Sequence, residues 1–283
     1  MSAPGIIRPA RRPSGWIAPG PRPLGTPGRP DVWPASGEDL CYLAGDWRIL
    51  QRVRGHRWSL DDLVTAWFAA SIAEPVAPAR IADLGCGIGA VLMLLAWRFP
   101  QARCVGIEAQ PVSAALARRS IALNGIEDRC AIRLGDLRDP AALSDGAVFN
   151  VVTGTPPYLP RGSATEPLRE QQAPCHIELR GGIEDYCAAA ARVLAPGARF
   201  VVCHAAGQRV RVLAAAQRAG LGVERRRDVI PRAGKGALFT VYAMRRTSEL
   251  ASCDVLPPLV VRAANGQRTD EFRTLRHQMG MPP

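Results

Sequence analysis

The stretch "DLGCGIG" at residues 83–89 decides the fold of this chain. It follows a short apolar run of strand length and leads into an apolar run of helical length at 88–98. Gly85 and Gly87 allow the backbone to approach a ligand closely, and Gly89 suits tight packing of a helix against a strand. A glycine-rich loop at such a junction is typical of sheets that bind nucleotides.

Strand-like and helix-like runs alternate along the rest of the chain. The predicted strands are 80–84, 104–108, 130–134, 148–154, 199–205, 222–230 and 236–245. The predicted helices are 88–98, 111–124, 183–194 and 207–219. This alternation predicts an α/β fold that is Rossmann-like, with a doubly wound, mostly parallel sheet.

Residues 1–37 differ in composition from the rest of the chain. They are rich in proline, carry five arginines and contain no acidic residue before Asp31. A segment of this kind buries too little apolar surface to order itself. The composition therefore predicts a disordered Pro/Arg-rich tail, which adds electrostatic attraction to a nucleic acid if it has a function.

The charge of the chain favours a polyanionic partner. The formal net charge is +11 at pH 7, from 36 Lys and Arg residues against 25 Asp and Glu residues. Lys235 is the only lysine, so part of this excess reflects a bias towards arginine. A basic protein with no nucleic-acid partner and a nucleic-acid-binding protein both fit these counts.

The cysteines and the apolar runs exclude several classes of protein. The eight cysteines form no C-x-x-C pair and no compact Cys/His spacing, so no metal site is predicted. The N-terminus lacks the apolar core of a secretory signal, and the run at 90–97 is too short to cross a bilayer. Reduced thiols in a cytoplasmic protein that does not enter a membrane are expected.

Three acidic residues follow three successive predicted strands. Asp83 suits a cationic ligand such as the ammonium group of S-adenosylmethionine, because a pyrophosphate would avoid its negative charge. Glu108 can accept hydrogen bonds from both ribose hydroxyls of an adenosine cofactor. Asp136 either contacts the adenine amino group, beside Leu137, or caps a helix that begins at Leu137. Open α/β sheets bind ligands at the carboxyl ends of their strands, where all three acids lie.

With these motifs in order, the chain resembles a known family. "DLGCGIG", "GIEAQ", "GD" and "GTPPY" are similar to the motifs of class I S-adenosylmethionine-dependent methyltransferases. The last motif resembles the signature Asn/Asp/Ser-Pro-Pro-Tyr/Phe of the enzymes that methylate amino groups. The segments 50–69 and 259–280 are similar to corresponding segments of the tRNA(Val) adenine-N6 methyltransferase family. The resemblance covers about residues 40–280.

The resemblance has consequences for the fold and for the cofactor site. It implies a seven-stranded sheet of the class I type within one domain at 38–283. A helical and strand-forming cap is expected at 38–78, and a strand and a helix at 256–283. The residues expected to bind the cofactor S-adenosyl-L-methionine are Asp61, Asp83, Gly85, Cys86, Gly87, Gly89, Glu108, Asp136 and Leu137.

The motif "GTPPYLP" at 154–160 carries the chemistry that this resemblance implies. The exocyclic amine of a base is a weak nucleophile, because its lone pair is delocalised into the ring. Two hydrogen-bond acceptors on its protons free that lone pair: the carbonyl of Pro156 is one, and Oγ1 of Thr155 stands where the family has Asn or Asp. Tyr158 is expected to stack on a base that has left its strand. The shorter reach of Thr155 weakens this chemistry without excluding it.

A polar loop at 161–182 follows the motif, where members of the family carry a loop on the substrate side. Arg161, Arg169 and Arg180 are the candidates for contacts with substrate phosphates, although a solvated loop explains them equally well.

The resemblance implies an S-adenosylmethionine-dependent N-methyltransferase that modifies adenine N6 of tRNA. Two other readings stay open. One is a protein glutamine N-methyltransferase of the release-factor type, and the other is a non-catalytic protein on a methyltransferase fold that binds RNA or a partner.

Overall fold

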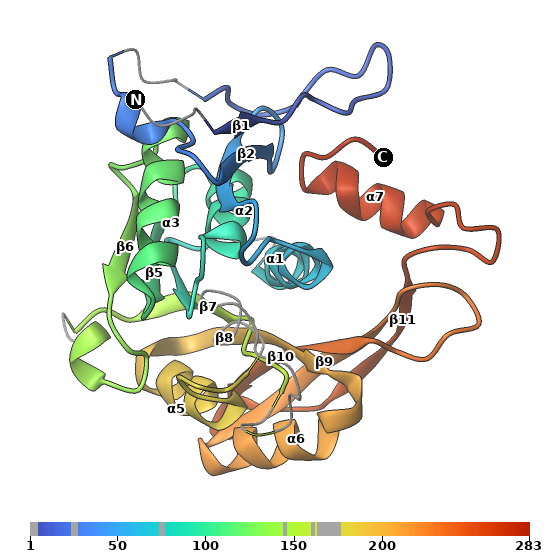
Figure 1. Cartoon of the computed structure of the whole chain (residues 1–283). Coiled ribbons are helices and arrows are strands. Elements are labelled where there is room, and N and C mark those ends of the chain that lie inside the picture. Colours follow the sequence, from blue (N-terminus) through green and yellow to red (C-terminus); the bar gives the residue numbers. More distant parts are fainter. Residues whose placement is uncertain (1–4, 24–27, 74–76, 144–145, 160–161, 163–176) are drawn as a thin grey trace.

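The computed structural model describes residues 5–23, 28–73, 77–143, 146–159, 162 and 177–283. Figure 1 shows a central twisted sheet with helices on both faces. This confirms the predicted α/β architecture, and its layers follow from strands whose two faces are both apolar.

Eight strands form the central sheet, in the order β11-β9-β10-β8-β7-β4-β5-β6. Their bounds are Arg80–Leu84 (β4), Arg103–Glu108 (β5), Cys130–Leu134 (β6), Phe149–Gly154 (β7), Leu194–Ala205 (β8), Leu221–Ile230 (β9), Phe239–Arg246 (β10) and Asp254–Val260 (β11). Only β10 runs antiparallel to its two neighbours, β8 and β9. The remaining pairs are parallel.

The sheet has one strand more than the seven that the resemblance implies. The eighth strand, β11, pairs in parallel with β9 and takes the edge position. Its consecutive residues Pro257 and Pro258 lie where the register with β9 shifts. Proline has no N–H to donate to a ladder, so such a strand is accommodated at an edge, where its other side needs no partner.

Helices cover both faces of the sheet. The helices α1 (Leu60–Ala73), α2 (Ala90–Arg98) and α3 (Pro111–Asn124) lie on one face, and α5 (Ile183–Val193) and α6 (Arg209–Arg218) lie on the other (Figure 1). The helix α7 (Asp270–Gln278) packs against β11. Short 3-10 turns are found at Pro30–Val32 (η1), Pro140–Leu143 (η2), Ala206–Gln208 (η3) and Thr247–Glu249 (η4).

A small second sheet lies beside α3. It consists of β1 (Ile6–Ile7), β2 (Glu38–Tyr42) and β3 (Arg48–Arg52), in that order. Its contacts with α3 include the amide of Leu50, which donates to Oγ of Ser120 at 2.9 Å. The region expected to form a cap at 38–78 thus contains β2, β3 and α1.

The composition predicts a disordered tail at residues 1–37, and the described part of this region makes several contacts with the domain. In its described part, β1 pairs in parallel with β2, Arg8 forms an ion pair with the buried carboxylate of Asp39 at 2.8 Å, and Arg12 pairs with Asp46 at 2.7 Å. Strand pairing and ion pairs thus take the place of the apolar surface that the segment lacks. Residues 1–4 and 24–27 lie outside the described residues.

A substitution at Gly20 tests whether residues 5–23 pack against the rest of the domain. A Cβ atom at Gly20 would meet Nε1 of Trp97, in α2, at 2.6 Å, whereas a Cβ atom at Gly15 would meet nothing within 4 Å. Both glycines have φ in the left-handed region, +80° and +75°, so alanine adds a similar backbone strain of about 1 kcal/mol at each. We expect Gly20→Ala to lower the free energy of unfolding more than Gly15→Ala does, and to speed the digestion of residues 5–23 by proteinase K. Identical behaviour of the two variants would show that the segment does not pack on Trp97.

Candidate active site

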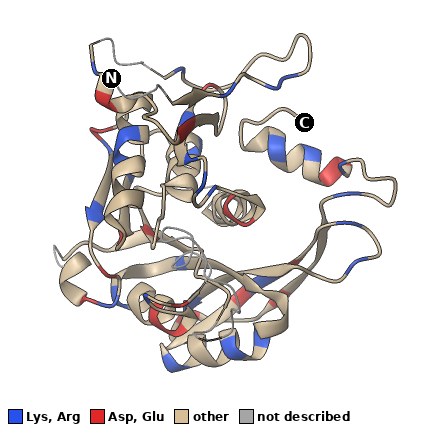
Figure 2. Cartoon of the chain, in the orientation of Figure 1, with Lys and Arg blue, Asp and Glu red and all other residues tan. Residues whose placement is uncertain are grey.

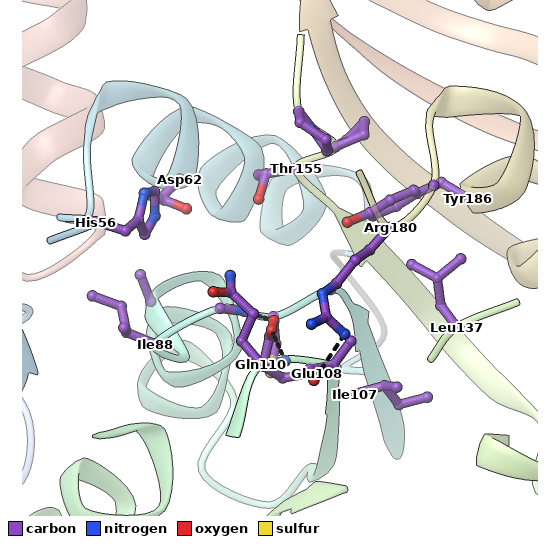
Figure 3. A pocket seen from close by; sticks show the side chains of 18 of the residues that line it. His56, Asp62, Ile88, Ile107, Glu108, Gln110, Leu137, Thr155, Arg180 and Tyr186 are labelled. Atoms are coloured by element: carbon purple, nitrogen blue, oxygen red, sulfur yellow. Dashed lines mark hydrogen bonds between the residues drawn. The ribbon is translucent and has the colours of Figure 1, made fainter. Parts of the chain in front are cut away.

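A cavity of about 590 Å³ opens at the carboxyl ends of the central strands. It lies where the strand order reverses, between β5 on one side of β4 and β7 on the other. Open α/β sheets bind ligands at this point, and the volume lies in the range of small-molecule sites. Figure 3 shows side chains from the loop after β4, the end of β5 and the start of α1 directed towards it.

Most of the residues predicted from the sequence line this cavity. They are Asp61, Gly85, Cys86, Gly87, Glu108, Asp136, Leu137, Thr155, Pro156, Tyr158 and Arg180. Asp83 and Gly89 do not line it. Arg161 and Arg169 lie outside the described residues.

The glycine loop at 85–89 is packed tightly at Gly85 and is open to the cavity at Gly87. Gly85 has φ +59°, and a Cβ atom there would collide with the hydroxyl oxygen of Tyr186. Gly87 has φ +55°, but a Cβ atom there would meet nothing within 4 Å. The amide of Cys86 donates to the carbonyl of Ile107 at 2.9 Å, which fixes the loop against β5. The backbone at Gly87 therefore faces free space in the cavity.

Glu108 links the glycine loop to the end of β5. Its Oε2 accepts a hydrogen bond from the amide of Gly87 at 2.8 Å, and its Oε1 accepts one from the amide of Gln110 at 2.6 Å. Burial raises the pKa of Glu108 above its ordinary value. Each carboxylate oxygen still has acceptor capacity, because it receives one hydrogen bond from these amides and carries two lone pairs.

Asp83 lies beneath the loop and not at the cavity surface. Its side chain is 2% exposed, and its Oδ1 accepts a hydrogen bond from Oγ1 of Thr153 in β7 at 2.8 Å. Burial raises its pKa to about 7. The side chain thus ties β4 to β7 inside the sheet, and its expected contact with a bound ammonium group stays a prediction.

The start of α1 brings a second pair of acids to the cavity. Asp61 accepts hydrogen bonds from the hydroxyl of Ser59 and from the hydroxyl of Tyr158, the latter at 3.3 Å. Asp62 also lines the cavity, and its Oδ2 accepts a hydrogen bond from the amide of Ser59 at 2.8 Å. Burial, followed by the charge of Asp61, raises the pKa of Asp62 well above its ordinary value. Sequence reasoning missed Asp62, although the doubled acid in "SLDDL" at a helix start was the available signal.

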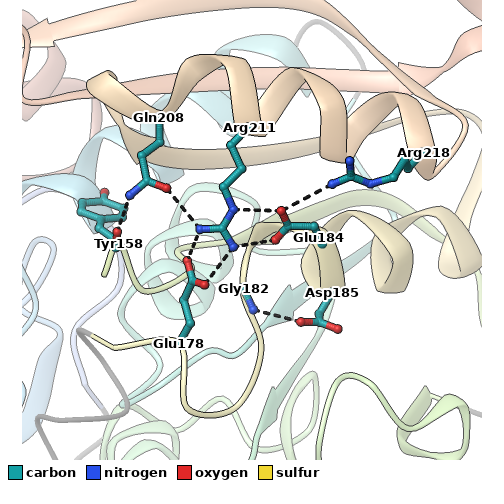
Figure 4. Close-up of polar contacts among 8 residues, drawn as sticks. All are labelled: Tyr158, Glu178, Gly182, Glu184, Asp185, Gln208, Arg211 and Arg218. Carbon is teal, nitrogen blue, oxygen red and sulfur yellow. Dashed lines mark hydrogen bonds and ion pairs between the residues drawn. The ribbon is translucent and has the colours of Figure 1, made fainter. Parts of the chain in front are cut away.

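The Pro-Pro-Tyr segment is held by Gln208, which lies in η3 directly before α6. The carbonyl of Tyr158 accepts a hydrogen bond from Nε2 of Gln208 at 2.7 Å, and Oε1 of Gln208 accepts one from Arg211 (Figure 4). The guanidinium of Arg211 also pairs with Glu178 and Glu184, at 2.7 Å in each case. These contacts connect the motif to the segment before α5. Tyr158, which we expect to stack on a base, donates its hydroxyl to Asp61 and brings that hydroxyl to 3.2 Å from Sγ of Cys203.

Asp136 and Arg180 border the opposite end of the cavity. Asp136 pairs with Arg138 at 2.6 Å, and this hydrogen bond lowers its pKa. No helix begins at Leu137: the chain turns there, and the side chain of Leu137 is buried against the cavity. Arg180 points back into the cavity, where its NH1 donates to the carbonyl of Ala109 at 3.4 Å, and its charge partly offsets the burial of Glu108 (Figure 3).

The site as a whole is suited to a positively charged ligand. Burial is the largest cause of the raised pKa of Asp62, of Asp83 and of Glu108, which lie in or directly under its wall. A cation bound among them would favour their ionised forms. Apolar contacts come from Ile88, Ile107 and Leu137, of which sequence reasoning identified only the last. No group of acidic, histidine or cysteine side chains within the described ranges has the arrangement of a metal site.

Comparison with known proteins agrees with this fold. Residues 81–170 match a family described as a methyltransferase domain. The chain is 32% identical over 142 residues to the tRNA1(Val) (adenine(37)-N6)-methyltransferase of Porphyromonas gingivalis, an alignment that covers 50% of this chain and 54% of the relative. It is 35% identical over 134 residues to the release factor glutamine methyltransferase of Mycolicibacterium smegmatis, covering 44% of this chain and 46% of the relative. The chain thus spans about half the length of these curated relatives.

A solved structure supports the fold independently. A predicted O-methyltransferase from Agrobacterium tumefaciens superposes with a TM-score of 0.60 at 21% identity, over 78% of this chain and 98% of that one. At this identity the likeness concerns the fold alone. None of the described helices combines the length and apolar character that a bilayer crossing requires.

The raised pKa of Asp83 predicts how stability depends on pH. Because its pKa is about 7 in the folded protein, its neutral form stabilises the fold at low pH, and this contribution is lost as the pH rises through 7. Asp83→Asn keeps the acceptor for Thr153 and removes the ionisation. We expect the unfolding free energy of the variant relative to wild type to rise by up to about 4 kcal/mol between pH 4 and pH 8, measured with urea in the absence of ligands.

Asp136→Asn is the matched control, since the ion pair with Arg138 lowers the pKa of Asp136. Its stability relative to wild type should fall as the pH rises from the lowered pKa of Asp136 to its ordinary value of 3.8, and should stay nearly constant between pH 4 and pH 8. Equal pH dependence of wild type and Asp83→Asn would refute the buried ionisation of Asp83.

Proposed function

We propose that this chain, which carries a methyltransferase domain with the class I fold and resembles the tRNA(Val) adenine-N6 family, transfers a methyl group from S-adenosylmethionine to N6 of an adenine in tRNA. One observation carries the proposal: the Thr155–Tyr158 segment and Glu108 face the same cavity from neighbouring parts of the sheet. The relative from P. gingivalis supports the choice of substrate.

The residues present fit S-adenosylmethionine. The open space at Gly87 lets the cofactor approach the loop backbone, and Glu108 keeps acceptor capacity for ribose hydroxyls. The buried acids Asp62 and Glu108 offer a favourable environment for its positive charges. When bound, the cofactor supplies an activated, electrophilic methyl group. Leu137 and Ile88 offer apolar contacts to an adenine ring.

Thr155 and Pro156 activate the nucleophile. Oγ1 of Thr155 and the carbonyl of Pro156 accept hydrogen bonds from the two protons of the target amine, which localises the lone pair on nitrogen. Consecutive prolines restrict the backbone. Gln208 donates a hydrogen bond to the carbonyl of Tyr158, two residues after Pro156. The acceptors are thus positioned before the substrate arrives, and the cost of ordering them is met during folding.

A second candidate substrate is the side-chain amide of a glutamine. The relative from M. smegmatis acts on release factor, and an amide nitrogen needs the same pair of acceptors as adenine N6. Methyl transfer from labelled cofactor into separate tRNA and protein fractions, followed by nucleoside and amino-acid analysis, distinguishes the two. Label in N6-methyladenosine supports the proposal, and label in methylglutamine replaces it with the second candidate. Label in neither fraction would favour a non-catalytic protein.

The role of Glu108 is tested by Glu108→Gln. This variant keeps the shape of the side chain but loses its charge, and it places an amide donor beside the amides of Gly87 and Gln110. We expect S-adenosylmethionine to bind about 1–3 kcal/mol more weakly by isothermal titration calorimetry. Asp128→Asn removes the same charge from an exposed position near the opposite end of β6 and should leave the affinity unchanged. Equal affinities for the two variants would remove Glu108 from the cofactor site.

The role of Thr155 is tested by two substitutions on the same RNA. Thr155→Val keeps the shape and deletes the hydroxyl, and turnover should fall by about 10²–10³-fold, as when one preorganised hydrogen-bonding group is removed from an active site. Cofactor affinity should stay unchanged, because the hydroxyl serves the substrate. Thr155→Asn restores the side chain of the family signature and should keep or raise adenine methylation.

Full activity of Thr155→Val would mean that the hydroxyl takes no part in the reaction. Activity confined to Thr155→Asn would mean that the natural side chain accepts a different nucleophile.

A further inference from the structure

A second cavity, of about 680 Å³, lies between the N-terminal segment, the β2–β3 hairpin and the C-terminal end of the chain. Five arginines line it: Arg8, Arg11, Arg12, Arg57 and Arg276. None of the described residues that line it carries a carboxylate. Figure 2 shows basic residues on α7 and on the N-terminal segment along the same side of the molecule.

The positive charge of this cavity is only partly balanced. Asp39, which is fully buried, pairs with both Arg8 and Arg57, and Asp46 pairs with Arg12. Within the described part of the chain, Arg11 and Arg276 have no acidic partner. Two carboxylates therefore balance only part of the charge of five guanidinium groups, which leaves a net positive charge at the cavity.

Arg276 is the most informative of the five. Its guanidinium is partly buried, donates through Nε to the carbonyl of Pro282 at 2.8 Å and contacts the sulfur of Met281. Burial, together with the charges of Arg268 and Arg262, lowers its pKa to about 10. A partly buried cation that lacks a counterion gains from a bound anion, which supplies both charge and hydrogen-bond acceptors.

This cavity adjoins the candidate active site. Arg57 lines both cavities, and it lies a few residues before Asp61 and Asp62 at the start of α1. A polyanion that places one of its units in the first cavity can therefore extend past Arg57 into the second cavity. Arginine matches the geometry of phosphate oxygens, because its planar guanidinium donates two parallel hydrogen bonds.

We propose that the second cavity binds a backbone phosphate of the RNA whose target base occupies the first cavity. The proposal rests on the RNA methyltransferase function proposed above and adds to it a defined phosphate site, built by the two ends of the chain. The N-terminal segment thereby has a role in binding: it supplies Arg8, Arg11 and Arg12 from one side, while α7 supplies Arg276 from the other.

The test compares the binding of an unmodified tRNA transcript by the full chain and by three variants, using fluorescence anisotropy over a series of salt concentrations. Arg11→Gln removes an exposed arginine of the cavity, and Arg276→Gln removes the partly buried one. Arg103→Gln removes one exposed charge at the start of β5, at the opposite end of the strands, and is the control. Thermal unfolding of each variant checks the fold, and Arg11→Gln keeps the test valid if Arg276→Gln is unstable.

We expect each cavity variant to weaken tRNA binding about fivefold to tenfold at moderate salt and to lower the slope of log affinity against log salt by about one. The control should differ little from wild type. Cavity variants that bind tRNA like Arg103→Gln would overturn the phosphate site, while methylation of tRNA by the wild type would still support the proposed function. A wild type that transfers no methyl group to tRNA would overturn the proposed function, whereas weaker tRNA binding confined to the cavity variants would still support the phosphate site.

Discussion

The site depends on one carboxylate that holds two segments of backbone together. Glu108 receives hydrogen bonds from the amides of Gly87 and Gln110, so the glycine loop after β4 and the turn after β5 are fixed relative to each other. Both amides belong to loops, whose donors would otherwise need water or a ligand. The same carboxylate retains acceptor capacity towards the cavity. One side chain thus orders the site and remains free to take part in recognition.

The sequence allowed most of the fold and much of the site to be predicted, for reasons visible in particular residues. Periodicity and glycine placement located β4, β5 and β7, and strand ends located Glu108 and Asp136 at the cavity. Periodicity does not predict which way a side chain at the end of a strand points. Asp83 turns inward to Thr153, a partner in another strand that sequence spacing does not reveal. Asp62 was missed because a doubled acid at a helix start resembles ordinary capping.

Composition does not reveal which charges pair over long sequence separations. The proline-rich start of the chain has too little apolar surface to fold by itself, yet Arg8 meets a buried Asp39 and Arg12 meets Asp46. Such pairing is specific to positions in space and leaves no local periodicity. The resemblance led us to expect a strand in the region of β11, and the adjacent prolines of that strand fit an edge position with a register shift.

The contact of both chain ends with Trp97 bears on the order in which the protein folds during synthesis. Gly20 lies against the indole from the N-terminal side, while Gly280 approaches it from the C-terminal side and accepts a hydrogen bond from the amide of Gly45 through its carbonyl. Contacts between residues so distant in sequence form late, because a long loop must close first. The segment around Gly280 must therefore leave the ribosome before this corner can assemble, and until then the segment around Gly20 remains open to chaperones and proteases.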